Sequence, residues 1–183
     1  MSYASVQRYN MGLAVASGKE VTVYGSDRPK EHSREARNFD GLMRDYLSSE
    51  SGKRFVQYVH SHGRDIMDVE FGSGDLGPNT VAATIHNGLE GIIVGNYSGR
   101  SFDERVDQLA KKYGAPAAAM REYVFSHELA HAAGHHKEAD TERFIKDYFT
   151  TRAFETQSGE RAQYVQLAKI AEQRAQEAEK AGK

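Results

Sequence analysis

The sequence contains no cysteine among its 183 residues. Without a thiol, the chain forms no disulfide, offers no thiolate to a zinc ion and has no thiol nucleophile. Any metal ion must therefore be held by histidine, aspartate or glutamate side chains.

The sequence also lacks an excess of charge and a long apolar segment. The formal net charge is −2 at pH 7, so there is no overall basic character that would imply a nucleic-acid partner. Nowhere do eighteen apolar residues follow one another, and the N-terminal residues have neither the basic start nor the apolar core of a targeting signal. We therefore expect a soluble, cytoplasmic protein that binds neither nucleic acid nor a membrane, and the oligomeric state stays open.

Composition and patterning divide the chain into a main domain and a tail. Hydrophobic residues make up 39% and charged residues 27% of the sequence, a balance that suits a small core with a polar extension. We predict one domain over residues 1–156 and a charged helical tail over residues 157–183. In this tail a narrow, alanine-rich stripe is formed by Tyr164, Ala168, Ala171, Ala175 and Ala178. Such a helix can dock on a partner, or it can lie over a cleft and regulate it.

Local patterns predict an alternation of helices and strands. Period-two alternation and β-branched residues predict strands over 20–25 and 65–71 and a hairpin over 81–97, whose Asn87-Gly88 pair favours a type I′ turn. Apolar residues at helical spacing and terminal signals predict helices over 31–48, 52–62, 101–114, 115–134 and 137–154. The GxGxxG pattern within 72–78 is followed by a β-like run rather than a helix, so we interpret it as a loop and not as a nucleotide site.

The segment SHELAHAAGHH, residues 126–136, carries the most informative spacing in the chain. Residues four apart lie on the same face of an α-helix, so His127 and His131 can each direct a ring nitrogen at one point about 2.0–2.1 Å away, the usual Zn–N distance. Glu128 is rotated by about 100° from His127 and lies beside that point. There it can act as the general base that deprotonates a metal-activated water. The spacing predicts a Zn²⁺ site with Glu128 as the catalytic residue.

The composition and the surroundings of the motif favour this interpretation. Chance would produce an HExxH pattern only about 0.03 times in a chain of this composition. Phe125, Leu129 and Ala132 occupy the opposite side of the same predicted helix and can bury it against a core. The alternative is a solvated or hydrogen-bonded histidine pair with an incidental glutamate, which requires no metal ion.

A catalytic zinc site needs a third protein ligand and an open fourth position. The glycine after the motif predicts the end of the helix, and a turn there would bring Glu138 and Glu142 back to the level of the two histidines. We expect one of these glutamates, with Glu138 favoured, to ligate the metal and the other to orient His127. The alternative for both glutamates is that they are acidic residues near the start of a helix, where negative charge complements the helix dipole. His135 and His136 remain alternative ligands, or form a solvated pair at the helix end.

Residues His127 to His131 form the HExxH signature, and EADTE, from Glu138 to Glu142, resembles the glutamate-helix element of gluzincins, with Glu142 where an aspartate is usual. The chain therefore resembles the zincin metallopeptidases, and in size the minigluzincins. The metzincin pattern HExxHxxGxxH is not met, because Lys137 stands at its last position. The resemblance implies an α+β, zincin-like fold: a short, mostly antiparallel sheet packed on helices, with an active-site helix and a following glutamate helix.

The resemblance also implies a function and further parts of the site. It implies a Zn²⁺ cofactor, a peptide or unfolded protein as substrate, an edge strand that holds the substrate, and a tyrosine or histidine that stabilises the oxyanion. The segment 92–97 is the nearest candidate for the edge strand, and Tyr123, Tyr148 and His136 are candidates for the donor. We predict a zinc metallopeptidase that is active or latent. The alternative is a non-catalytic zincin-like regulatory or interaction module with a bound metal.

Overall fold

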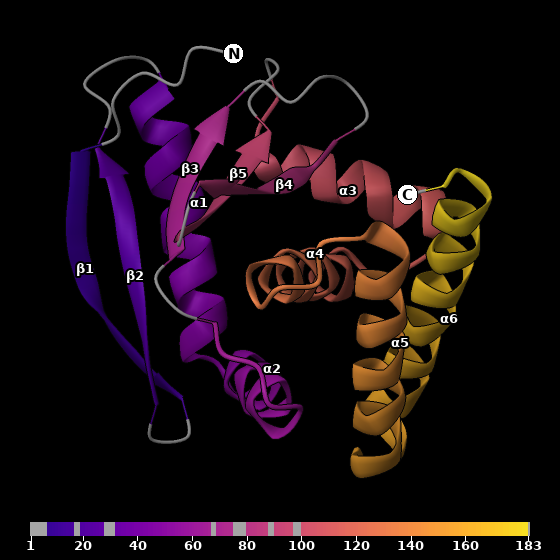
Figure 1. Ribbon diagram of the computed structural model, residues 1–183. Helices are drawn as coiled ribbons and strands as arrows, with labels where there is room; N and C mark the ends of the chain where they lie inside the picture. The colour runs from indigo at the N-terminus through magenta and orange to yellow at the C-terminus, as the bar shows by residue number, and fades with distance from the viewer. Residues whose placement is uncertain are drawn as a thin grey trace.

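The computed structural model describes residues 7–16, 19–27, 32–66, 69–74, 80–87, 90–96 and 100–182. Its helices are α1 (His32–Ser48), α2 (Glu50–Ser61), α3 (Phe102–Tyr113), α4 (Ala117–Ala132), α5 (Glu138–Glu155) and α6 (Ser158–Lys180). Its strands are β1 (Gln7–Ala16), β2 (Lys19–Asp27), β3 (Val69–Gly74), β4 (Ala82–Asn87) and β5 (Glu90–Asn96). Figure 1 shows α4 in the middle, between the strands with α1 on one side and the paired helices α5 and α6 on the other.

The strands form one mixed sheet in the order β1-β2-β3-β5-β4. The pairs β1–β2 and β4–β5 are antiparallel, whereas β2–β3 and β3–β5 are parallel. Because β3 pairs with β5 and not with β4, β5 lies inside the sheet and β4 forms one of its two edges. The prediction that segment 92–97 supplies an edge strand is therefore wrong.

The predicted fold class, an α+β fold with a short, mostly antiparallel sheet packed on helices, is also wrong. The structure is mostly helical, and half of the strand pairings are parallel. Among the side chains that the structure describes, the buried apolar core comes almost entirely from helices, with Val69 of β3 as a strand contribution. The error has a simple origin: the family motif covers only residues around α4 and the start of α5, and strand patterns do not indicate the direction in which distant strands pair.

Most of the predicted elements are present, with shifted ends. Ser101 and Glu104 form the predicted capping box at the start of α3, and Gly114 ends that helix with a φ of 63°. The predicted hairpin exists as β4 paired with β5, although Gly88 of its turn lies outside the described residues, as do residues 75–79 of the predicted loop. Strand β1 was not predicted, because small residues interrupt its apolar pattern and weaken the β signal. No helix in the described ranges is long and apolar enough to cross a bilayer.

Helix α4 is the centre of the packing and carries the HExxH motif. It contacts each of the other five helices and strands β4 and β5. Phe125 stacks on Phe102 with ring centroids 5.3 Å apart, and Leu129 is completely buried. These residues anchor one side of α4, as the sequence predicts, and the other side is buried as well, so the motif is fixed on a rigid element.

Helix α4 also buries a carboxyl group on the side that faces α2 and α5. The Glu122 carboxyl lies close to Ser51 and Arg152, and its Oε1 has no hydrogen-bond partner among the described residues. Burial raises the pKa of Glu122 to about 7, although the Ser51 hydrogen bond and the Arg152 charge lower it. A carboxyl whose pKa is higher in the folded than in the unfolded state makes the protein less stable as pH rises from about 4.5 to 7.

We expect Glu122→Gln to remove this loss of folding stability at higher pH. The stability of the variant relative to the wild type should increase by about 2–3 kcal/mol between pH 4 and pH 8, since one pKa unit corresponds to about 1.4 kcal/mol. Chemical denaturation of the metal-free proteins at both pH values measures the difference. The exposed Asp107 offers a control, because Asp107→Asn should change stability little at either pH. If Glu122→Gln changed the free energy of unfolding equally at both pH values, the pKa of Glu122 would not be raised in the folded protein.

Candidate metal centre

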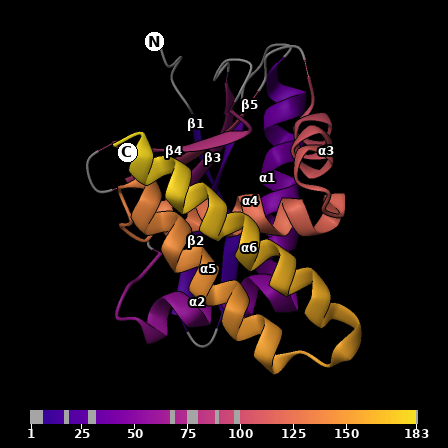
Figure 2. The same cartoon turned by 90° about the vertical axis from the view of Figure 1, so that its right-hand side faces the viewer.

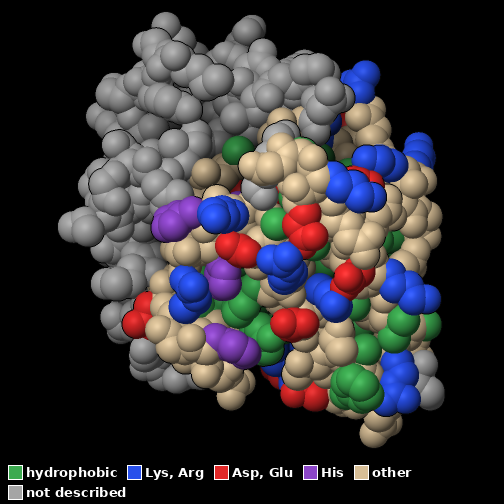
Figure 3. Space-filling view, turned by 45° about the vertical axis from the view of Figure 1, so that its right-hand side comes forward, with side chains coloured by type: hydrophobic (Ala, Val, Ile, Leu, Met, Phe, Trp, Pro, Cys, Tyr) green, Lys and Arg blue, Asp and Glu red, His purple; other side chains and the backbone are tan. Residues whose placement is uncertain are grey.

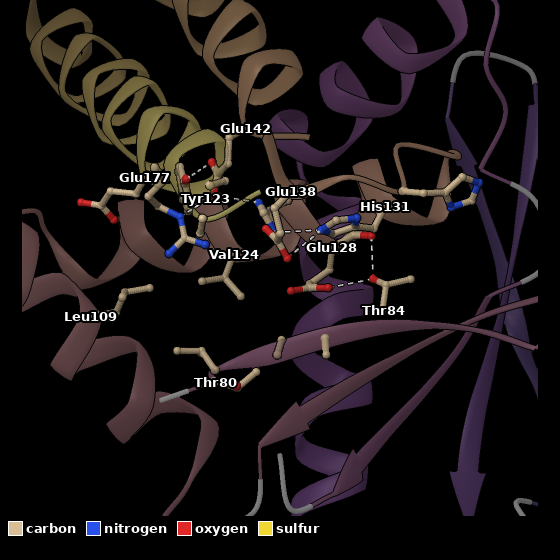
Figure 4. Close-up of a pocket in the computed structure, with 18 residues that line it drawn as sticks. Thr80, Thr84, Leu109, Tyr123, Val124, Glu128, His131, Glu138, Glu142 and Glu177 are labelled. Atoms are coloured by element: carbon tan, nitrogen blue, oxygen red, sulfur yellow. Dashed lines mark hydrogen bonds and ion pairs between the residues drawn. The ribbon is translucent and has the colours of Figure 1, made fainter. Parts of the chain in front are cut away.

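The candidate site forms where the end of α4 meets the start of α5 (Figure 4). Helix α4 ends at Ala132, and Gly134 follows with a φ of 94°, a backbone conformation that favours glycine. The short turn sends the chain directly into α5, which begins at Glu138. The turn that the sequence predicted is thus present, and it places the first acidic residues of α5 opposite the histidines of α4.

Three donor atoms from the two helices converge on one point. The Nε2 atoms of His127 and His131 lie 3.1 Å apart. The two carboxylate oxygens of Glu138 lie 3.4 Å from His127 Nε2 and 3.6 Å from His131 Nε2. A tetrahedral ion with bonds of about 2.0–2.1 Å separates its ligand atoms by about 3.4 Å. The residues therefore fit a zinc ion, and the group could hold a metal.

The second nitrogen of each imidazole ring has a polar neighbour that can orient the ring. His131 Nδ1 lies 2.6 Å from the carbonyl oxygen of His135. A carbonyl can only accept, so the Nδ1 of a neutral His131 carries the proton and its Nε2 presents a lone pair. His127 Nδ1 lies 3.3 Å from Glu142 Oε1, within ion-pair distance. Such neighbours orient a ligating histidine and raise its basicity.

The carboxylates around the histidines give the site a negative potential. Burial lowers the pKa of His127, but the carboxylates of Glu142, Glu138 and Glu128 outweigh it and raise this pKa to about 10. In return, hydrogen bonds from His127 and His131 hold the pKa of the Glu138 carboxyl well below its usual range. The same carboxylates that stabilise a proton on His127 also favour the binding of a divalent cation between the two histidines.

Glu128 lies beside the three donor atoms and is held by the edge strand. The hydroxyl of Thr84 in β4 donates to Glu128 Oε2 over 2.7 Å and lies 2.9 Å from the Glu128 carbonyl oxygen. Only 4% of Glu128 is exposed, yet it lines the cavity over the site. The role of Thr84 was missed, because a threonine in a strand is common and carries no signal for a contact 44 residues away.

A cavity of about 650 Å³ lies over the candidate centre (Figure 4). Its walls come from the start of β4 and the residues before it and from α3, α4, α5 and α6. The residues that line it include Thr80 and Thr84 on the strand side and Arg174 on α6. One wall is therefore a sheet edge, and another belongs to the C-terminal helix.

The other candidate residues differ in how they relate to this cavity. His136 and Tyr123 line it. The Tyr123 hydroxyl, however, donates to Glu142, and the Tyr148 hydroxyl donates to the carbonyl oxygen of Ser51 in α2 over 3.2 Å. The His135 ring packs on an aromatic ring of α5 with centroids 4.3 Å apart. Burial and the neighbouring Arg64 lower the pKa of His135 to about 4, and only its backbone contacts the site directly.

No protein-family model, curated protein or solved structure matches the chain. The resemblance to zincins therefore depends on the HExxH motif and on the side chains that surround it. Those side chains form a His-His-Glu group that could hold a metal ion.

Proposed function

We propose that the protein is a zinc-dependent metallopeptidase. The observation that carries this proposal is the convergence of His127 Nε2, His131 Nε2 and the Glu138 carboxylate at separations of 3.1–3.6 Å. A general base, Glu128, lies next to them and lines the same cavity. Two imidazoles and a carboxylate form the ligand set of a catalytic zinc site that keeps one position open.

The side chains around the centre each have a role in this chemistry. A bound zinc ion would supply a lowered pKa for water and polarisation of a peptide carbonyl. Glu128 would accept the proton of the attacking water and pass it to the leaving amine. The Thr84 hydroxyl holds one oxygen of that carboxylate, so the group stays in one orientation during both transfers. The Glu142 carboxylate would keep the His127 ring directed at the ion.

The position of β4 supports a peptide substrate. β4 is one of the two edge strands of the sheet, and Thr80 to Thr84 line the cavity over the centre. An extended chain can pair with the unpaired backbone groups of a sheet edge. Strand β4 would thus hold a substrate in the role that the resemblance implied for segment 92–97.

Metal analysis combined with a hydrolysis assay tests the proposal. The purified protein should contain about one zinc ion per chain after exposure to zinc and should hydrolyse an unfolded protein such as reduced, alkylated casein. Removal of the metal with a chelator should abolish hydrolysis, and added zinc should restore it. Stoichiometric zinc without hydrolysis would instead favour the second candidate function, a non-catalytic module with a bound metal. The observation that favours this second candidate is that residues of α6 form part of the cavity wall. A protein that takes up no zinc would contradict both functions.

A further inference from the structure

Helix α6 contributes a charged side chain to the surroundings of the candidate centre. Figure 2 shows α6 lying along α5, with α4 behind the pair. From this helix, the Arg174 Nε donates to the Oε1 of Glu142, the same oxygen that lies 3.3 Å from His127 Nδ1. The guanidinium of Arg174 also lies over the ring of Tyr123, 5.9 Å from its centroid. Arg174 is thus linked to His127 through a single carboxylate.

Glu142 needs this partner because it is buried. Its side chain is only 1% exposed, and a buried carboxylate is costly unless charges and hydrogen-bond donors surround it. Its three neighbours come from two other helices: His127 and Tyr123 from α4, on either side of the carboxylate, and Arg174 from α6. Burial raises the pKa of Glu142, but these three neighbours together hold it below its ordinary value. Arg174 is the one permanent full charge among the three.

We propose that Arg174 is a positioning residue of the metal centre, which holds the Glu142 carboxylate against His127. Helix α6 is then a structural part of the centre and not a detachable tail. The burial of its apolar side chains agrees with this role: Tyr164, Leu167, Ile170 and Ala171 belong to the same core as α4 and α5. The inference rests on the proposed function, because it needs His127 to be a ligand.

Other ion pairs between α5 and α6 provide matched comparisons. Arg143 pairs with Glu179, and Lys146 pairs with Glu172. All four side chains are at least 40% exposed, and basic and acidic groups mingle on this face in Figure 3. Exposed pairs of this kind contribute little to stability. They join the same two helices as the Arg174–Glu142 pair but use other carboxylates.

Zinc affinity of the full chain tests the role of Arg174. Competition with a chromophoric chelator should show about 10-fold weaker zinc binding for Arg174→Gln, at the lower end of the range for outer neighbours of metal ligands. Arg143→Gln should change the affinity less than about two-fold, because it breaks an exposed α5–α6 pair. Arg174→Lys keeps the charge and should recover part of the loss. Equal affinities of Arg174→Gln and Arg143→Gln would overturn the inference, while zinc binding by the wild type would leave the proposed function intact.

A double-mutant cycle distinguishes positioning from a general effect on folding. If Arg174 acts through the carboxylate, Arg174→Gln should weaken zinc binding less than about two-fold further once Glu142→Gln is present. Fully additive losses would show that Arg174 acts by another route and would overturn the inference. Thermal unfolding of the metal-free variants reports any loss of the fold separately. A wild-type chain that does not bind zinc would end both the inference and the proposed function, and that result is visible before any variant is compared.

Discussion

Glu128→Gln should bind zinc with wild-type affinity and hydrolyse unfolded protein about 10²- to 10⁴-fold more slowly, the usual contribution of a general base. Glu128 is not one of the three converging donors, so its loss leaves the ligand set intact. The amide has nearly the same shape as the carboxylate, and its oxygen can still accept the hydrogen bond of Thr84. The variant loses the negative charge and the ability to take a proton from water, but it keeps all three donor atoms.

A second glutamate on the same helix provides the control for this experiment. Glu122 is half-buried, with its carboxyl close to Ser51 of α2 and Arg152 of α5, so Glu122→Gln should keep both zinc and full hydrolysis. If Glu128→Gln hydrolysed the substrate as fast as the wild type, Glu128 would not be the base. If it lost zinc instead, Glu128 would have to be a ligand or a support of one.

Local spacing predicted the parts of the site that lie on neighbouring turns of one chain segment. The interval of four between His127 and His131 places both rings on one helix face, and the early stop at Gly134 determines how soon α5 can return. The structure accordingly places Glu138 against both Nε2 atoms and Glu142 behind His127. This arrangement was expected before any tertiary contact was known, while the ligand roles themselves remain predictions.

Contacts between distant segments could not be predicted in the same way. Thr84 reaches Glu128 because the hairpin of β4 and β5 is placed beside α4, and Arg174 reaches Glu142 because α6 folds back along α5. Neither position departs from the ordinary pattern of a strand or of a charged helix. The prediction that segment 92–97 is the edge strand is wrong for a related reason. A hairpin motif indicates that two strands pair, but not which of them takes a third neighbour.

Glu138→Gln should lower zinc affinity by at least about 100-fold, more than the loss of an outer neighbour of a ligand typically causes. The variant keeps the size of the side chain but replaces the only negatively charged group among the three converging donors. Asp140→Asn is the matched control, because it removes one negative charge from the same first turn of α5. Asp140 is exposed and pairs with Arg143 over 3.2 Å, so its variant should bind zinc within about two-fold of the wild type.

The comparison of Glu138→Gln with Glu142→Gln then identifies the third ligand. The geometry predicts that Glu138→Gln loses far more zinc affinity than Glu142→Gln, since Glu138 faces both Nε2 atoms and Glu142 faces only the Nδ1 of His127. Chelator competition measures both losses on one scale. The reverse order would make Glu142 the ligand and would require the His127 ring to turn over. Wild-type affinity in both variants would leave His136 at the cavity wall as the remaining candidate.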